Sequence, residues 1–456
     1  MSLDNLDRPI NVFPRKSFLL KTLVKDIDLT DAVLDLIDNS IDSHIEKNIE
    51  GKRDVKLTLS KDKFTIEDNC GGIKKDRIYD DVFRFGKKSE DNRETIGVFG
   101  VGLKRSIFKM GKNILLESDD GDNFFTVHID EHWLNDDDDF ELHIQSDSPS
   151  KGTPLLRISI TDLFPGMAEE LGNQVFINNL IAKIRRTYPI LIKKRVNISI
   201  NGYFIVPQEF KLLYGNGFLP LHRKYHIDDV ETELYAGFTN EVTKNDPYGW
   251  FVFCNDRLVL DKDVSYRTGW GGDAPNYHYP EDNNFLGLIF FRSQNPSSLP
   301  WKTTKDDIQL DSGLYRQAQV DMRQITQKFV GVIHSASRAK DQDGETIGKS
   351  FFEGVPLMPI LEITEEQIEA IPVIPVYQQA IKSIDDYNLE DIPIAEDEEI
   401  RGTERNIVYS SIQYIKEKDL IDKVKKSLKN PFMSNKSVGE QTFNYYVDME
   451  GIKKND

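Results

Sequence analysis

Residues 31–46 read "DAVLDLIDNSIDSHIE", and this stretch decides the fold of the first part of the chain. The apolar residues within 29–48 recur at spacings of three and four: Ala32, Val33, Leu36, Ile37, Ile41 and Ile45. Such spacing is typical of a helix that buries one face. Asp35 and Asn39 are four residues apart and therefore lie next to each other on this helix. We expect a helix that packs on a sheet and presents carboxylate and amide groups on its other side.

Asp35 and Asn39 have the chemistry of a candidate site. An amide oxygen is a suitable ligand for a hard cation such as Mg²⁺, and a carboxylate one turn away can orient or deprotonate a water molecule. A solvated helix face would show the same pair without any function. The pair therefore becomes informative only together with other motifs.

The overall charge restricts the partners. The chain has 456 residues, with 58 Lys and Arg against 76 Asp and Glu, which gives a net charge of −18. An acidic surface repels nucleic acid unless basic residues gather locally. One such cluster is "AKIRRTYPILIKKRV", residues 182–196, but a solvated helix and strand edge is the favoured interpretation of it. DNA binding is thus left open and is not indicated by the net charge.

Cysteine content and hydropathy indicate a soluble protein of a reducing compartment. Cys70 and Cys254 cannot form the disulfide framework of a secreted scaffold, and neither has a neighbour at metal-ligand spacing. The first residues do not resemble a secretory leader, and no apolar run approaches the length of a membrane span. We expect a cytoplasmic protein without membrane contact.

The pattern of elements predicts an α+β fold in three parts. Residues 1–195 alternate helical and strand patterns, and we expect a mixed antiparallel sheet covered by helices on one face. Residues 196–335 begin with the hairpin "VNISINGYFIV", continue through strands that include "GWFVFCNDRLVL", and end in a helix over 314–333. Residues 336–456 are rich in proline and acidic residues and are expected to form a partly flexible linker, with a helix over 407–428.

A second motif, "IEDNCGG", ends a predicted strand at Asp68 and turns through Gly71 and Gly72. Two adjacent glycines allow a close backbone approach that a Cβ would prevent. A carboxylate held at the strand end can accept a hydrogen bond from an exocyclic amine such as that of adenine. In isolation the motif is only a turn.

A third motif is the glycine-rich "TIGVFGVGLKRSIFKMGK". Gly97, Gly100 and Gly102 precede a helix that is predicted to begin near Leu103, so that backbone N–H groups form an anion site with Lys104 at its mouth. The spacing fits neither a P-loop nor a Rossmann fingerprint. A fourth, weaker feature is Gly152-Thr153 at the start of a predicted strand, where a hydroxyl could hold a water or a base nitrogen.

The four features, in this order, resemble the nucleotide-binding motifs of the GHKL superfamily of ATPases, which includes gyrase B, heat-shock chaperones, histidine kinases, MutL and MORC proteins. The resemblance covers about residues 16–335 and is closest to the MutL and MORC branches. It implies the GHKL (Bergerat) ATP-binding sandwich over 1–195, a transducer-type α/β domain over 196–335, and a partner-docking or dimerisation region over 336–456. ATP and Mg²⁺ are the implied cofactors.

The resemblance also implies roles for individual residues. Asn39 would ligate Mg²⁺, Asp68 would bind the adenine amino group, and Thr153 would support Asp68 from a neighbouring strand. Gly71 and Gly72 would shape the base pocket. The phosphate lid and the following helix would include Gly97, Gly100, Val101, Gly102, Leu103 and Lys104, and in "FRFGKKSED" Lys88, with Lys87 or Ser89 as alternatives, would approach a phosphate.

The second block resembles the transducer of the MutL and MORC proteins. "GWFVFCNDRLVL" is similar to a transducer strand that carries an Asn-Arg pair, here Asn255 and Arg257. "LPWKTTKDDIQLDS" resembles the loop whose lysine reaches back to the γ-phosphate. That lysine would be Lys305, with Lys302 as the alternative. Histidine kinases have no such element, and the first histidine, His44, lies inside the predicted nucleotide helix, so the resemblance favours an ATP-gated, dimerising protein.

Asp35 departs from the family pattern. Hydrolysing members carry glutamate, the general base, four positions before the magnesium asparagine. The shorter Asp35 either requires a closer helix or makes hydrolysis slow. Asp38 is the nearest alternative base but is expected to face away from Asn39. Asp35 therefore leaves two functions open: an ATPase switch that dimerises on ATP binding, and a nucleotide sensor with little turnover.

By analogy with the family, an ATPase switch of this kind would act in DNA maintenance or phage defence, and its C-terminal region would bind a protein partner. These roles rest on the resemblance and not on particular residues.

Overall fold

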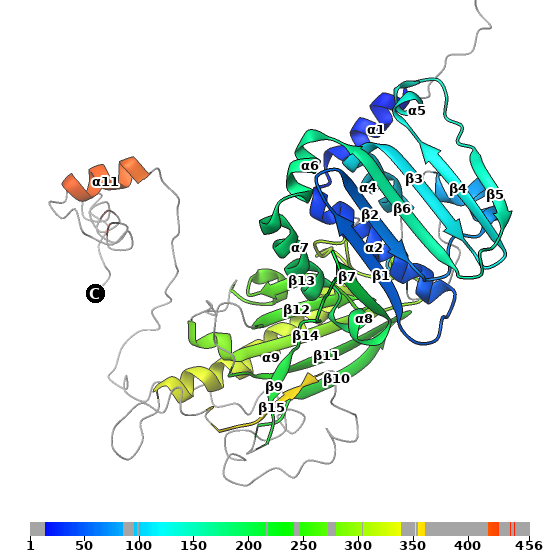
Figure 1. Cartoon of the computed structure of the whole chain (residues 1–456). Helices are drawn as coiled ribbons and strands as arrows, with labels where there is room; N and C mark the ends of the chain where they lie inside the picture. Colours follow the sequence, from blue (N-terminus) through cyan, green and yellow to red (C-terminus); the bar gives the residue numbers. More distant parts are fainter. Residues whose placement is uncertain are drawn as a thin grey trace, which may run out of the picture. The chain divides into compact units, whose positions relative to one another are not determined.

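The computed structural model describes residues 14–84, 95–97, 100–215, 218–240, 247–271, 280–302, 304–338, 352, 354–360, 418–427, 438 and 442. The chain divides into two compact units, Met1–Tyr387 and Asn388–Asp456. The first unit contains the two large sheets of Figure 1 and a small two-stranded sheet. In the second unit the helix α11 covers Lys418–Ser427, so the rest of the helix predicted over 407–428 lies outside the described residues.

The first sheet has eight strands in the order β5-β4-β3-β6-β2-β1-β7-β8. Its neighbours are antiparallel, except that β7 runs parallel to β1. The predicted mixed antiparallel sheet is thereby confirmed. The strands are β1 Arg53–Leu59, β2 Lys63–Asp68, β3 Gly111–Asp119, β4 Asn123–Ile129, β5 Ile144–Pro149, β6 Leu155–Leu163, β7 Val196–Ile200 and β8 Tyr203–Phe204.

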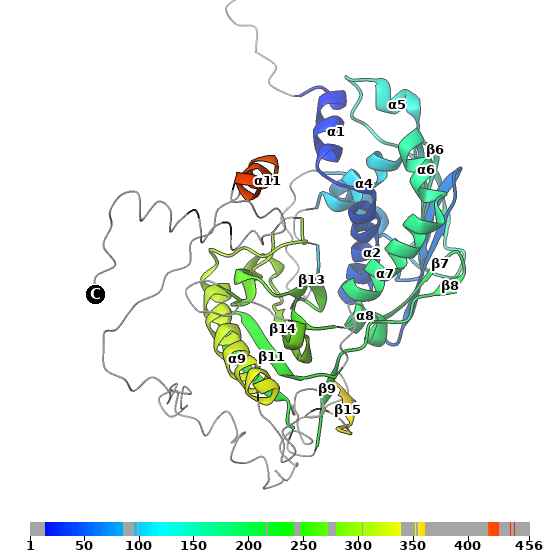
Figure 2. The same ribbon diagram turned by 90° about the vertical axis from the view of Figure 1, so that its left-hand side faces the viewer.

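Helices cover one face of this sheet, and Figure 2 shows α2, α4 and α7 on the same side. The helix α2 begins after Asp28, whose side chain accepts a hydrogen bond from the Asp31 N–H group, and its apolar stripe is buried. The predicted α+β sandwich is thus confirmed. The helices of this part are α1 Lys16–Lys25, α2 Leu29–Glu46, α3 Lys75–Arg77, a π-helical turn Ile78–Val82, α4 Gly102–Met110, α5 Glu131–Asn135, α6 Pro165–Leu171, α7 Gln174–Thr187 and α8 Pro189–Lys194.

The second sheet has five strands in the order β10-β11-β14-β12-β13, and the helix α9 packs against β11 and β14. The buried core is continuous from the first sheet through α8 to this sheet, which explains why both sheets form one compact unit. None of the described helices has the length and apolar character needed to cross a membrane. The elements of this sheet are β10 Leu221–Ile227, β11 Val230–Phe238, β12 Gly249–Cys254, β13 Arg257–Asp263 and β14 Phe285–Arg292, and α9 covers Gly313–Arg338. The small two-stranded sheet consists of β9 Lys211–Leu213 and β15 Leu357–Pro359.

Two elements differ from the sequence prediction. The hairpin expected to begin the second block belongs to the first sheet, where β7 extends the sheet beyond β1. The single strand expected in "GWFVFCNDRLVL" is a hairpin of β12 and β13. Its turn residues Asn255 and Asp256 both have a left-handed backbone, with φ of 44° and 62°. Two such residues in succession are typical of the tight turns that connect antiparallel strands.

A half-buried carboxylate stabilises the second sheet. Glu233 on β11 accepts hydrogen bonds from His222 Nε2 at 3.1 Å, Tyr235 Oη at 2.8 Å and Arg292 Nη1 at 2.5 Å. Burial alone would raise the pKa of Glu233, but the bonds from His222 and Arg292 outweigh it and hold the pKa well below its ordinary value. The stabilisation is therefore present above about pH 4.3, the ordinary pKa of glutamate, and is lost as the pH falls below it.

We expect Glu233→Gln to lower the free energy of unfolding by about 2 kcal/mol at pH 7, the usual contribution of charge-assisted hydrogen bonds. Urea unfolding at a series of pH values measures it, and the difference from wild type should narrow as the pH falls below about 4.3. Glu209→Gln, which changes an exposed carboxylate, is the control. A difference that is independent of pH would contradict this role.

Candidate functional site

The polar face of α2 is the centre of the candidate site. Asp35, Asp38, Asn39 and Asp42 stand at positions i, i+3, i+4 and i+7 and therefore share one side of the helix. The three aspartates are buried, whereas Asn39 is partly exposed. Buried carboxylates require partners, because an unpaired charge inside a protein is costly. The partners of these side chains define what the site can do.

Asp35 lies against the start of α4. Its Oδ2 atom accepts a hydrogen bond from Arg105 Nε at 2.6 Å, and its Oδ1 atom is 3.8 Å from Lys305 Nζ. A Cβ at Gly102 would lie 3.3 Å from Asp35 Cγ, so a glycine at this position lets α4 approach the carboxylate closely. The structure thus brings Asp35, Gly102 and Lys305 together. Sequence reasoning missed Arg105.

Asp38 is the most completely paired carboxylate on this face. It accepts hydrogen bonds from Tyr188 Oη at 2.6 Å, Arg257 Nε at 3.0 Å and Lys305 Nζ at 2.8 Å. Burial alone would raise its pKa, but Arg257 and Lys305 outweigh burial and hold the pKa of Asp38 below its ordinary value. The expectation that Asp38 faces away from the site is wrong: it adjoins Asp35 one turn along the helix and shares Lys305 with it.

The side-chain amide of Asn39 is available to a ligand. Its buried Nδ2 atom has no hydrogen-bond partner among the described residues, so the protein does not fix this amide, and its oxygen is the atom that would bind a cation. The described residues contain no cluster of three or more His, Cys, Asp or Glu that would hold a metal alone. Mg²⁺ commonly takes only one or two protein ligands and completes its shell with phosphate oxygens and water. The residues present therefore fit a magnesium ion held largely by a nucleotide.

Asp68 lies at the end of β2, beside α2. Its carboxylate accepts hydrogen bonds from Ser40 Oγ at 2.6 Å and from the Cys70 N–H group at 2.9 Å, and burial raises its pKa. These two bonds leave acceptor capacity on both oxygens. The hydroxyl beside Asp68 comes from Ser40, whereas Thr153 is exposed and makes no hydrogen bond to Asp68 in the described structure.

The double glycine after Asp68 is explained by close packing. Gly72 has a φ of +65°, and a Cβ there would lie 2.0 Å from the carbonyl oxygen of Asp119, at the end of β3. Gly71 has a φ of +104°, and a Cβ there would meet the Lys47 side chain. Lys47 Nζ donates to the carbonyl oxygen of Gly72. This turn therefore holds the end of β2 against α2 and β3.

The helix α2 and the second sheet both hold the segment Thr95–Gly97. Asp42 on α2 accepts hydrogen bonds from the N–H groups of Ile96 at 2.6 Å and Gly97 at 2.7 Å, and burial raises the pKa of Asp42 to about 7. From the second sheet, Asn255 Nδ2 donates to the Thr95 carbonyl oxygen at 2.8 Å. Asn255 thus contacts the glycine-rich motif, and Asp42 is a further residue that sequence reasoning missed.

The helix α4 begins close to the predicted position, but Lys104 is placed differently from the prediction. The helix begins at Gly102, after Gly100 with a φ of +62° and Val101 at the N-cap, and Leu103 lies in the first turn. Lys104 is buried, donates to the carbonyl oxygens of Val82 and Arg84 at 2.8 Å each, and has a pKa lowered to about 8 by burial. It therefore does not lie at the mouth of an anion site. Lys88 lies outside the described residues.

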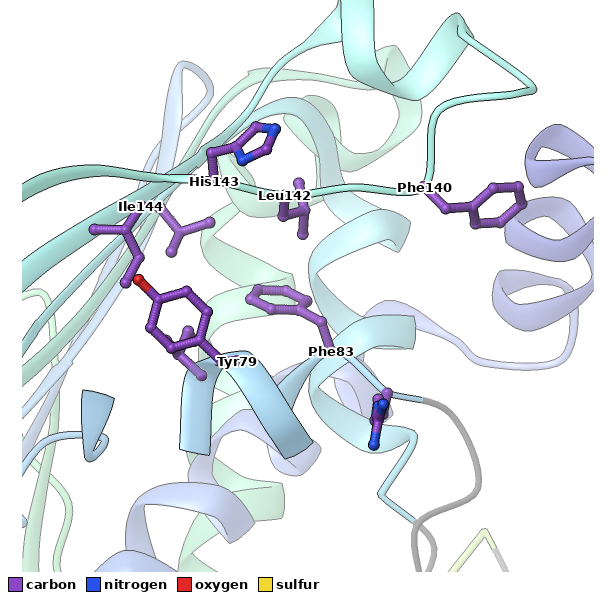
Figure 3. Close-up of a pocket in the computed structure, with 9 residues that line it drawn as sticks. Tyr79, Phe83, Phe140, Leu142, His143 and Ile144 are labelled. Atoms are coloured by element: carbon purple, nitrogen blue, oxygen red, sulfur yellow. The ribbon is translucent and has the colours of Figure 1, made fainter. Parts of the chain in front are cut away.

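A pocket of about 220 Å³ lies between the π-helical turn and the segment before β5. Figure 3 shows the rings of Tyr79 and Phe83 facing Leu142 and Ile144. The described residues that line it include no carboxylate or amide side chain and none of the predicted site residues. The pocket therefore does not supply the groups considered above for a magnesium-bound nucleotide.

Comparison with known proteins connects the part of the chain that contains this face with a family of ATPases. Residues 27–156 match the family model described as histidine kinase-, DNA gyrase B- and HSP90-like ATPase. No curated protein matches the chain. The matched range contains α2, the end of β2 and the start of α4, and it ends before Tyr188, Arg257 and Lys305. The match supports assignment to the GHKL superfamily, whose domains are generally ATPases.

Proposed function

We propose that the protein is an ATP-dependent conformational switch that binds ATP with Mg²⁺ on the polar face of α2, hydrolyses it slowly and dimerises while ATP is bound. One observation carries the proposal. Lys305, from the loop before α9, reaches across to α2 and lies 2.8 Å from Asp38 and 3.8 Å from Asp35. A lysine from outside the family-matched segment thus lies at the polar face of α2. Its partner Asp38 directly precedes Asn39 in the helix.

The proposed roles follow the chemistry of the side chains. Asn39 would offer its amide oxygen to Mg²⁺, and Asp68 would accept a hydrogen bond from the adenine amino group. Lys305 would contact the terminal phosphate. Bound Mg²⁺ would neutralise phosphate charge, and Asp35 would orient and deprotonate the attacking water. The same division of roles supports two parts, an ATP-binding domain expected over 1–195 and a transducer expected over 196–335. Because β7 and β8 pair within the first sheet, we propose that the ATP-binding part extends through β8.

A second candidate function is nucleotide sensing with little turnover. Asp35 is not only shorter than glutamate; its Oδ2 atom is also engaged by Arg105 at 2.6 Å. A carboxylate oxygen that already accepts a hydrogen bond from a guanidinium is less available to a water molecule. This ion pair supports slow hydrolysis or none.

The cellular setting is also a proposal. Cys70 and Cys254 are both buried and unbridged, which suits a reducing cytoplasmic compartment. The MutL-like or MORC-like affiliation, and with it DNA maintenance or phage defence, extends the analogy beyond the matched segment. A docking or dimerisation role for residues 336–456 belongs to the same analogy.

Light scattering tests the switch. We expect the molar mass to be that of a monomer without nucleotide and with ADP. With Mg²⁺ and a non-hydrolysable ATP analogue it should double. Asn39→Ala and Lys305→Met should abolish the doubling, because one removes the proposed magnesium ligand and the other the phosphate contact. Lys302→Met is the matched control, since Lys302 is exposed and pairs with Asp307 on its own loop. An unchanged mass with the analogue, despite measurable binding, would refute the dimerisation step.

A further inference from the structure

Asp38 binds donors from three separate parts of the chain. Tyr188 follows α7, Arg257 begins β13, and Lys305 lies in the loop before α9. The side chains of Asp38, Arg257 and Lys305 are 1%, 6% and 8% exposed, so the cluster is shielded from water. Charge interactions in such a setting are stronger than at the surface. Asp38 is therefore the place where the second sheet is fixed electrostatically to α2.

Lys305 is held by both its backbone and its side chain. Its carbonyl oxygen accepts a hydrogen bond from Arg257 Nη1 at 2.6 Å, while its ammonium group pairs with Asp38. Its φ of +58° lies in the left-handed region, which a lysine rarely adopts and which must be maintained by surrounding contacts. Arg257 and Asp38 supply those contacts. The direction of the Lys305 side chain is thus set by Asp38.

The same ion pair limits what Lys305 can do. The ammonium group of Lys305 is paired with Asp38. It must leave this carboxylate, or contact the carboxylate and the phosphate together, before it can neutralise a phosphate. Asp38 and a terminal phosphate are both anionic, and close like charges oppose each other. Arg257 makes the exchange feasible, because it continues to neutralise Asp38 after Lys305 has left and no buried carboxylate is stranded.

We propose that Asp38 is a positioning residue that holds Lys305 in the nucleotide-free protein and yields it to the terminal phosphate of a nucleoside triphosphate. This inference rests on the proposed function, in which Lys305 contacts that phosphate. It adds a resting partner for the lysine. The negative charge of Asp38 therefore weakens triphosphate binding, whereas a diphosphate, which does not recruit Lys305, is little affected.

Calorimetric titration with Mg²⁺ and either a non-hydrolysable ATP analogue or ADP measures this effect. We expect Asp38→Asn to raise the ratio of analogue affinity to ADP affinity about fivefold or more, a modest part of what one close charge contributes. The rise should vanish in the Lys305→Met background, because Asp38 acts through that lysine. A ratio equal to that of wild type, or a rise that persists without Lys305, would overturn the inference. Asp38→Ser, checked for folding by thermal unfolding, provides the same comparison with a smaller side chain.

A second measurement needs no nucleotide. Acetylation of lysines by a water-soluble reagent, followed by mass spectrometry, should modify Lys305 several-fold faster in Asp38→Asn than in wild type, while exposed Lys302 reacts equally in both. Equal Lys305 rates would overturn the holding role of Asp38. If wild type binds neither nucleotide, the proposed function fails, while the labelling experiment still reports on the Asp38–Lys305 pair.

Discussion

Asp35→Asn is expected to lower the maximal rate of phosphate release by about 100-fold or more, the usual contribution of a positioned general base. The amide keeps an oxygen for Arg105 but cannot take a proton from water. ATP affinity should change little, because the proposed magnesium and adenine contacts belong to Asn39 and Asp68. Phosphate release at saturating ATP measures the rate, and equilibrium binding of an ATP analogue measures the affinity.

Asp31→Asn is the matched control, because Asp31 lies one turn earlier on α2 and is only half-buried. Asp35→Glu and Asp35→Ala complete the series. If the short side chain limits the rate, Asp35→Glu should release phosphate faster than wild type. Equal, background-level release by wild type and all three Asp35 variants would mean that the protein senses nucleotide without hydrolysing it.

The fold of the first sheet follows largely from local sequence patterns. The apolar spacing around Ile37 predicted a helix over 29–48, and α2 covers Leu29–Glu46. The alternating helical and strand patterns of residues 1–195 predicted a mixed antiparallel sheet, which the structure confirms, for example in the antiparallel pairing of β1 with β2. These patterns are reliable because one face of each element must be buried, so the period of the apolar residues reflects the geometry of the element.

Register and long-range pairing could not be predicted in the same way. Successive residues of a helix point about 100° apart, so the choice between Lys104 and Arg105 depends on the exact rotation of α4. Only the packed structure shows that Arg105 meets Asp35 while Lys104 turns to the carbonyl groups of Val82 and Arg84. Similarly, strand alternation in β7 does not encode which sheet it joins, because its partner β1 lies far away in the sequence.

The inter-sheet contacts show the same limit in the candidate site. The resemblance singled out Lys305, Asn255 and Arg257 as a group, but it did not indicate their partners on α2. The structure pairs Lys305 and Arg257 with Asp38, a residue expected to face elsewhere. Asp38 lies 300° around the helix from Asp35, or 60° in the other direction, so a broad polar face includes it as readily as Asn39. The breadth of the polar face depends on how many groups from the second sheet and the loop before α9 contact α2. The local sequence of α2 does not reveal this.

Asp68→Asn is expected to weaken ATP binding by about 100-fold, because a charge-assisted hydrogen bond contributes about 1.5–3 kcal/mol and each 1.4 kcal/mol is a factor of ten. The substitution also places a donor where the adenine amino group would donate. The Ser40 hydroxyl at 2.6 Å and the Cys70 N–H group at 2.9 Å orient the carboxylate, so Ser40→Ala should weaken binding by a smaller factor. Equilibrium titration with an ATP analogue measures both effects.

Base selectivity separates a direct adenine contact from a loss of structure. Guanine carries a carbonyl oxygen where adenine carries its amino group, so an asparagine that donates there should favour the GTP analogue relative to wild type. Asp119→Asn is the matched control: Asp119 is also buried at a strand end, where Ser150 and the Lys151 N–H group bind its carboxylate. It should leave the ATP-to-GTP preference unchanged. If Asp68→Asn lost the same factor of affinity for the ATP analogue and the GTP analogue, Asp68 would only stabilise the packing of β2 on α2. A residue that only supports the fold cannot distinguish one purine from the other.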